Sequence, residues 1–173
     1  MNLKKVMVIN VVVMFLLSVL FHFMYSFLPC FVTSVFFPVN ESIWEHMKLF
    51  VTSILVCGLL DKFIFKYFNI YYNNLLFSSV FTSILSVILY LVIYLPLYKL
   101  FGEVMFISIG LMIIVYIVMS FVSYKILTSN KINVNSLFLI LVILITYVSF
   151  TVLTYYPVKY FLFYDINEKK YGI

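Results

Sequence analysis

The sequence predicts an all-α fold, a polytopic integral membrane bundle of about five transmembrane helices. Hydrophobic residues make up 66% of the 173-residue chain and charged residues only 10%, whereas soluble domains are about half apolar and about one quarter charged. The mean hydropathy is +1.20. The apolar residues also fall into five runs of roughly 20 residues, a length that crosses a hydrocarbon core of about 30 Å. These observations exclude an ordinary soluble domain.

The apolar runs are separated by charged residues, asparagine and proline. All four prolines fall at the edges of the runs, where proline does least damage to a helix. We therefore expect a single transmembrane domain over 1–173. Its predicted helices lie at about 6–27, 40–60, 75–95, 104–124 and 134–156, and a polar tail follows at 157–173.

The basic residues indicate orientation. The net charge of +5 rests on eleven lysines scattered along the chain, so we expect the lipid bilayer as partner and no nucleic acid. An inside N-terminus places six loop lysines in the cytoplasm and two outside, as the positive-inside rule favours, although the tail then adds three lysines outside. We predict N-terminus inside and C-terminus outside. The bias toward Lys, Ile, Phe, Tyr and Asn suggests a bacterial cytoplasmic membrane.

One polar stretch interrupts this apolar chain, P-V-N-E-S-I-W-E-H-M-K at 38–48. The apolar part of the predicted second helix, 49–60, would rise only about 18 Å, so the polar turns before it must help to cross the membrane. Glu45 and His46 then lie about 8 to 9 Å below the helix start, and His22 of the first helix lies at about the same depth. The only two histidines could meet there.

A helical projection of this stretch separates two sides. At about 100° per residue one stripe is polar and the opposite stripe is apolar and lipid-like. The polar stripe holds Glu41, Glu45 and Lys48, with Ser42 and His46 beside it; the apolar stripe holds Ile43, Met47, Phe50 and Ile54. An ionisable residue within a membrane helix is costly unless it has a partner, so the polar stripe is a candidate functional site.

Several of these residues also have purely structural explanations. Ser42 and Glu45 fit a capping box, and Asn40 is an equally plausible cap. Trp44 is typical of an anchor at the membrane interface. His22 and His46 could simply be a hydrogen-bonded pair within the bundle.

The leading functional prediction is an outer-face polar pocket that binds a small ligand, a lipid headgroup or a membrane partner. Its candidate ligand-binding residues are His22, Tyr25, Asn40, Glu41, Trp44, Glu45, His46, Lys48 and Asp165. Asp165 belongs to the polar tail, which could form a lid over the pocket by reaching Lys48 or His46, or could be a frayed terminus.

Two other functions stay open. A membrane hydrolase could use Glu45 or His46 as its catalytic base, with or without a divalent metal such as zinc. The candidate metal ligands are His22, Glu41, Glu45 and His46, although the chain has no H-E-x-x-H motif. A small transporter acting as a homo-oligomer is the third possibility; the chain shows no internal repeat, which weighs against it, although a second copy could supply the missing half.

Four segments carry a family resemblance: H-F-M-Y at 22–25, P-V-N-E-S-I-W-E-H-M-K-L at 38–49, L-F-Y-D at 162–165 and Y-G-I at 171–173. With them the chain resembles an uncharacterised bacterial membrane family, domain-of-unknown-function family 6512, over nearly its whole length. The resemblance implies a small polytopic membrane protein and supplies no reaction.

The chain departs from the family pattern in two places. The family usually has an acidic residue and Trp after the H-F-x-Y element, where this chain has Ser26 and Phe27. It usually has P-P-H in the tail, where this chain has Pro157, Val158 and Lys159. If that tail histidine serves a site in the family, its absence here weighs against a multi-histidine metal site.

Overall fold

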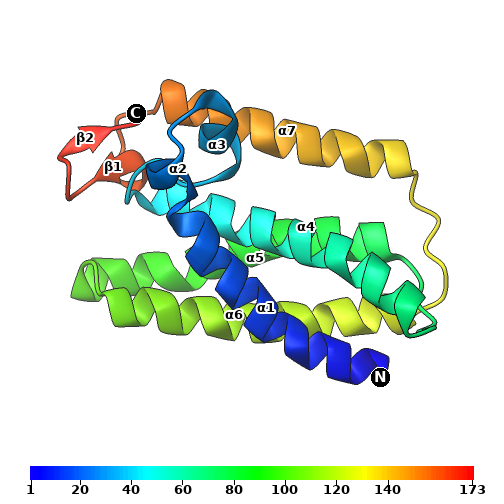
Figure 1. Cartoon of the computed structure of the whole chain (residues 1–173). Coiled ribbons are helices and arrows are strands. Elements are labelled where there is room, and N and C mark those ends of the chain that lie inside the picture. Colours follow the sequence, from blue (N-terminus) through cyan, green and yellow to red (C-terminus); the bar gives the residue numbers. More distant parts are fainter.

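The computed structural model describes all residues, 1–173, and confirms the all-α fold class (Figure 1). The long helices are α1 (Leu3–His22), α4 (Ile43–Tyr67), α5 (Leu75–Phe101), α6 (Met105–Thr128) and α7 (Ser136–Tyr155). The short elements are α2 (Met24–Phe27), α3 (Phe31–Phe36), the 3-10 turn η1 (Phe161–Phe163) and the strands β1 (Tyr164–Asp165) and β2 (Lys170–Tyr171).

Four helical segments are long and apolar enough to cross a membrane. They are Leu3–Phe27, which joins α1 and α2, Leu75–Phe101, Met105–Thr128 and Ser136–Tyr155. The fifth long helix, α4, is not among them; it carries Glu45, Lys48 and Asp61 among its buried residues. The count of five membrane-spanning helices therefore stays a prediction.

Two helix boundaries differ from the predicted ones for local reasons. Helix α4 begins at Ile43, because Ser42 is extended and its side chain accepts the amide hydrogen of Glu45 as an N-cap. Helix α5 passes through Pro96 and ends at Phe101, followed by the C-cap Gly102, whose φ of 70° suits glycine. Pro96 lies in the last turns of the helix, where losing one backbone hydrogen bond disturbs few residues.

Helix α4 lies at the centre of the bundle, where it packs against α1 and α5. Its residues Met47, Phe50 and Ile54 are buried in the main hydrophobic core. The prediction that this stripe faces lipid is therefore wrong. These three residues pack against α1, α5 and α6, and lipid tails and protein interiors are both apolar, so an apolar stripe in the sequence cannot distinguish them.

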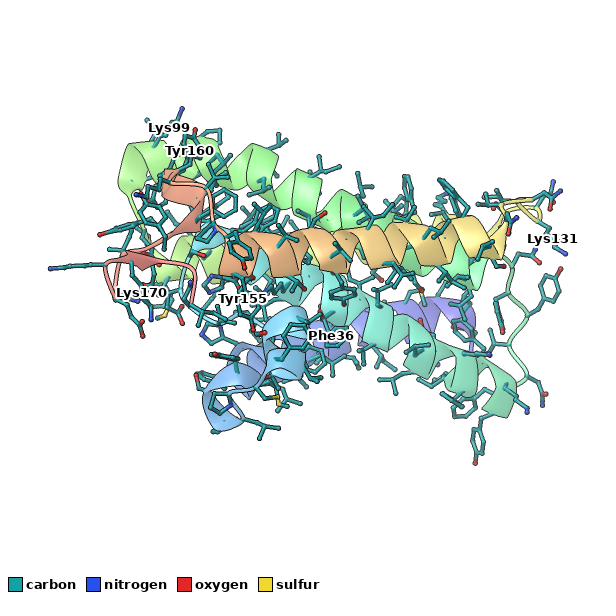
Figure 2. All side chains as sticks on the ribbon, turned by 90° about the horizontal axis from the view of Figure 1, so that it is seen from above. Phe36, Lys99, Lys131, Tyr155, Tyr160 and Lys170 are labelled. Atoms are coloured by element: carbon teal, nitrogen blue, oxygen red, sulfur yellow. The ribbon has the colours of Figure 1, made fainter.

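The connections gather at two ends of the bundle. The N-terminus and the segments 68–74 and 129–135 lie at one end, whereas α2, α3, the α5–α6 turn and the C-terminal hairpin lie at the other (Figure 1). Seen from above, Lys131 marks the first end, and Lys99 and Lys170 mark the second (Figure 2). The polar stretch at 38–48, the end of α1 and the tail thus share one end of the molecule.

The tail is folded onto the bundle, which contradicts the alternative of a frayed terminus. Strands β1 and β2 pair antiparallel, with Tyr164 opposite Tyr171 and Asp165 opposite Lys170. The chain then turns at Gly172, which has a φ of 67°. A Cβ at this position would lie only 2.6 Å from the carbonyl oxygen of Thr154 in α7. Only glycine fits this close approach without strain.

Candidate functional site

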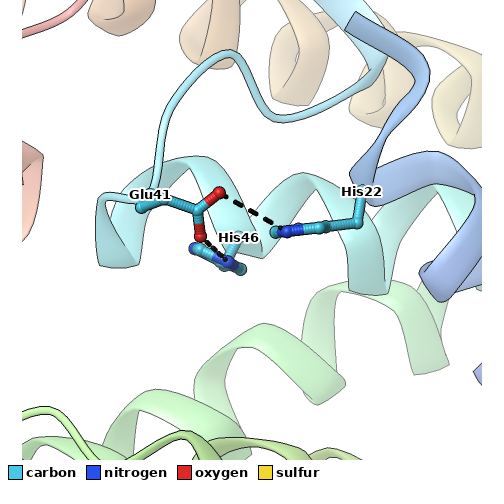
Figure 3. Close-up of side chains that lie close together, drawn as sticks. All are labelled: His22, Glu41 and His46. Carbon is cyan, nitrogen blue, oxygen red and sulfur yellow. Dashed lines mark ion pairs between the residues drawn. The ribbon is translucent and has the colours of Figure 1, made fainter. Parts of the chain in front are cut away.

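Two histidines and one glutamate meet at the end of the bundle that carries the tail (Figure 3). The carboxylate of Glu41 lies between the rings, with Oε1 3.4 Å from Nε2 of His22 and Oε2 3.3 Å from Nε2 of His46. The ring centroids of the two histidines are 5.3 Å apart. We call these three residues the His–Glu–His cluster. It brings the end of α1 against the start of α4.

The tautomer of His46 follows from its second contact. Its Nδ1 lies 2.9 Å from the carbonyl oxygen of Ser42, one turn earlier. A carbonyl can only accept, so Nδ1 carries a hydrogen and donates it. The contact between Nε2 and Oε2 of Glu41 is a hydrogen bond when the ring is protonated; in the neutral ring the lone pair of Nε2 is free for a metal ion. This is the arrangement in which histidines bind metals, with one nitrogen fixed by a backbone carbonyl.

The loop that carries Glu41 is held by the tail. The amide of Glu41 donates to Oδ2 of Asp165 at 2.9 Å, and Nδ2 of Asn40 donates to the carbonyl of Gly172 at 2.9 Å. Asn40 also accepts from the amide of Ser42 through Oδ1. Asp165 was predicted to reach Lys48 or His46; it binds the backbone of Glu41 instead, and so positions Glu41 indirectly.

Glu45 lies apart from the His–Glu–His cluster. Its Oε2 is 2.6 Å from Nζ of Lys48 and accepts the amide of Val39, while its Oε1 accepts the hydroxyl of Thr154 at 2.6 Å. Nζ of Lys48 also donates to the carbonyl of Ser34 at 2.7 Å. Glu45 and Lys48 therefore form a buried ion pair that joins α4 to α3 and α7.

The predicted stripe of Glu41, Glu45 and Lys48 is thus divided into two sites. The projection assumed that the helix includes Glu41, but Glu41 precedes the first helical residue, Ile43. An angle of about 100° per residue holds only inside a helix. The structure therefore groups Glu41 with the histidines and leaves Glu45 with Lys48.

Trp44 and Tyr25 also lie outside the cluster. Trp44 packs against Phe150 and Phe163, with ring centroids 5.4 and 5.0 Å away, and its buried Nε1 has no hydrogen-bond partner. Tyr25, in α2, is not among the residues that line a cavity beside the cluster. Trp44 therefore fastens α4 to α7 and η1.

A cavity of about 430 Å³ opens beside the cluster. Helices α1, α4, α5 and α6 form its walls, and Asn167 of the tail reaches it. Eleven of its 18 lining residues are hydrophobic, among them Phe15, Phe50 and Met112. The polar lining residues are Ser18, His22, Glu41, His46, Glu103, Ser108 and Asn167. The cavity is thus mostly apolar, with its ionisable groups concentrated around Glu41 and the two histidines.

Sequence reasoning missed the part of this cavity that α5, α6 and the turn between them supply, including Tyr90, Tyr94, Glu103 and Ser108. Tyrosines and serines are scattered through all the apolar runs. No local pattern shows which of them face α1 and α4, because tertiary packing alone decides it.

The cluster gathers three side chains of the kinds that bind divalent metals. One ligand atom from each of His22, Glu41 and His46 can be chosen so that all lie within 4.8 Å of one another. Ligands of a tetrahedral zinc ion lie about 2.0 to 2.1 Å from the metal, which places them about 3.4 Å apart. Small side-chain rotations would bring the ligand atoms from their present separations of up to 4.8 Å to this distance. Three protein ligands leave a fourth position for water or substrate.

Comparison with known proteins identifies a family and no relative of known function. A family model described as "Family of unknown function (DUF6512)" matches residues 1–173. No curated protein matches the chain. No solved structure matches it either.

Proposed function

The chain belongs to the DUF6512 family, whose function is unknown, and from its structure we propose that it is an integral membrane protein that binds a small amphiphilic molecule. The ligand lies in the 430 Å³ cavity, with its polar head at the His–Glu–His cluster and its apolar part against the walls. The observation that carries this proposal is the combination of an apolar cavity with one group of ionisable side chains.

The outer surface supports the membrane part of the proposal. Large apolar side chains are exposed along the helices that would face lipid. On α1 these include Val8, Val12 and Leu16, and on α7 they include Leu137, Leu141, Ile145 and Val148. In water such a surface would be far larger than the apolar patches of soluble monomers. We propose that α4 crosses the bilayer inside the bundle, since its buried ionisable side chains lie among the other helices.

The size and lining of the cavity favour a compact ligand. Ligand sites in proteins usually occupy about 300 to 1,000 Å³ and have mostly apolar walls with a few polar groups that fix orientation. Glu41 and Glu103 supply negative charge, and the histidines can donate or accept hydrogen bonds. These groups suit an amine-bearing head on a single apolar chain.

The test uses lysophosphatidylethanolamine as the probe and native mass spectrometry as the readout. Met112→Trp, on the cavity side of α6, fills the cavity, whereas Ile114→Trp, exposed on the same helix, is the matched control. We expect the wild type and Ile114→Trp to retain one probe molecule and Met112→Trp to lose it. Equal retention by both tryptophan variants would show that the cavity is not the binding site.

A second candidate function, a metal-dependent hydrolase, is favoured by the spacing of the ligand atoms in the cluster. A zinc ion held there would lower the pKa of its bound water and make a nucleophile. The chain's own contribution would be to hold Nε2 of both histidines toward the open cavity and to exclude bulk water.

Zinc titration of the purified protein tests this second candidate. We expect one zinc per chain, with His46→Ala and Glu41→Gln each weakening binding at least tenfold. Glu168→Gln, an exposed carboxylate in the tail, is the control and should bind zinc as the wild type does. A protein without stoichiometric zinc would remove the hydrolase mechanism and leave the amphiphile proposal standing.

A further inference from the structure

A second, smaller cavity lies toward the opposite end of the same four helices. Its volume is about 20 Å³, which exceeds the roughly 10 to 15 Å³ that one water molecule needs. The large cavity is lined by α1, α4, α5 and α6, and so is this one. Its polar lining residues are Asn10, Asp61, Ser79, Thr82, Ser120 and Ser123.

Asp61 is the only carboxylate in this lining, and one of its two oxygens has no hydrogen-bond partner. The side chain is 4% exposed, and its Oδ2 accepts from Nδ2 of Asn10 at 2.7 Å. Its Oδ1 is buried and has no hydrogen-bond partner. Asp61 takes part in none of the ion pairs of the chain, which involve other residues. A buried carboxylate without a counter-charge is strongly unfavourable.

The hydroxyl groups around Asp61 present acceptors to the cavity. Ser79 donates its hydrogen to the carbonyl of Leu75, and Thr82 donates to the carbonyl of Ser78. Ser120 likewise donates to the carbonyl of Met7 in α1. A hydroxyl whose hydrogen is committed in this way has only lone pairs left to offer. The cavity lining is therefore electron-rich and suits a cation.

The charge and the volume limit which cation fits. One carboxylate balances one positive charge, and oxygen ligands are those that hard cations prefer. Magnesium demands near-ideal octahedral geometry and usually keeps several waters, for which a cavity of about 20 Å³ has no room. We propose that Asp61 and the hydroxyls of α5 and α6 bind one monovalent cation of the size of Na⁺.

This cation site is separate from the large cavity. No residue lines both cavities, and the buried Tyr116 joins α1 to α4, because its hydroxyl contacts the hydroxyls of Ser18 at 2.5 Å and Ser53 at 2.8 Å. Ser18 lines the large cavity and Met14, one turn earlier, lines the small one. Binding of Na⁺ at Asp61 is therefore independent of ligand binding in the large cavity, and an experiment can exclude one without excluding the other.

The experiment measures thermal unfolding of the full chain in nonionic detergent. NaCl is titrated against choline chloride at constant ionic strength. We expect the midpoint to rise saturably with Na⁺, by about 5 to 10 °C at 100 times the dissociation constant. Direct binding of radioactive ²²Na⁺ to the wild type gives a second measurement that needs no variant.

Two variants separate a specific site from a general salt effect. Asp61→Asn removes the charge while keeping the shape, so it should fold and lose the Na⁺ response. Thr82→Val should weaken Na⁺ binding at least tenfold. Valine has about the same volume as threonine but lacks the hydroxyl oxygen that would contact the cation. Glu168→Gln, in the exposed tail, should respond as the wild type does.

Three results would overturn the proposal. The first is an equal midpoint in Na⁺ and choline together with no ²²Na⁺ binding. The second is a Na⁺ response that persists in Asp61→Asn. The third is a midpoint that changes with pH but not with Na⁺, which would mean that a proton alone occupies Asp61; Cys57 is the other titratable group in this lining.

Discussion

The backbone amide of Glu41 donates to Oδ2 of Asp165 at 2.9 Å, across 124 residues of sequence. Asp165 is 1% exposed and also accepts the amides of Asn167 and Glu168 through Oδ1. One carboxylate thus orders the turn of the tail and the loop that carries Glu41. The geometry of the His–Glu–His cluster depends on a residue that touches neither histidine.

Replacing Asp165 with asparagine should free both segments at every pH, whereas in the wild type only acid should free them. Burial raises the pKa of Asp165, but the backbone amides of Glu168, Glu41 and Asn167 outweigh it and hold the pKa below its usual value. Such a carboxylate stabilises the fold above its unfolded-state pKa of about 3.9, and this contribution is lost as the pH falls through the lower folded value.

Hydrogen-exchange mass spectrometry measures this effect locally, as protection factors of the amides at 41, 167 and 168. In the wild type, protection should be high at pH 6 and should fall below about pH 4. Asp165→Asn should show low protection at both. Protection that stays high in the wild type at pH 2.5 would contradict this account.

Lys48→Met should strongly destabilise the protein. The variant leaves the carboxylate of Glu45 buried without its cation, which typically costs about 3 to 5 kcal/mol. The double variant Glu45→Gln with Lys48→Met should recover much of this loss, because no uncompensated charge remains. Chemical unfolding in detergent would give the free energies, and a double variant no more stable than Lys48→Met would argue against the ion pair.

Gly172→Ala should loosen the tail. The added Cβ would be strained at a φ of 67° and would meet the carbonyl oxygen of Thr154, so we expect a cost of about 1 to 3 kcal/mol. Gly110→Ala is the matched control, since nothing lies within 4 Å of its Cβ and it sits inside α6. That change should stabilise by about 0.5 to 1 kcal/mol. Equal effects of the two substitutions on thermal stability would contradict the role of Gly172.

Cysteine labelling tests the predicted orientation. Cys30 is exposed at the end of the bundle that carries the tail, and Cys57 is buried. With the C-terminus outside, a membrane-impermeant maleimide should label wild-type protein in intact cells and should not label Cys30→Ser. Labelling that appears only after the cells are permeabilised would reverse the orientation.

The sequence correctly predicted that His22 and His46 lie close together, but the helical projection wrongly grouped Glu45 with Glu41. Counting residues from the two helix ends placed His22 and His46 at one level, and their rings indeed lie 5.3 Å apart. That estimate placed the helix ends at 27 and 40, whereas α1 ends at His22 and α4 begins at Ile43, but both assumed ends lay a few residues too far out, so the two depths still agreed. The projection needed the position of the helix start, and an error of three residues wrongly grouped Glu45 with Glu41.

Other features of the site were beyond sequence reasoning for a physical reason. The burial of Asp61 against Asn10 depends on how α1 and α4 cross, and these residues are 51 positions apart. The Lys48 contacts with Ser34 and Thr154 likewise join separate helices. Nothing local in the sequence marks such pairs, because each residue alone looks like an ordinary polar interruption of an apolar run.

The hydrogen bond between the amide of Glu41 and Asp165 also limits when the site can form during synthesis. By the time Asp165 is translated, α1, α4 and all the other long helices have already been made. The two histidines can therefore approach each other early, but Glu41 takes its final place only after the tail has docked. The site therefore cannot be completed before residue 165 has been made.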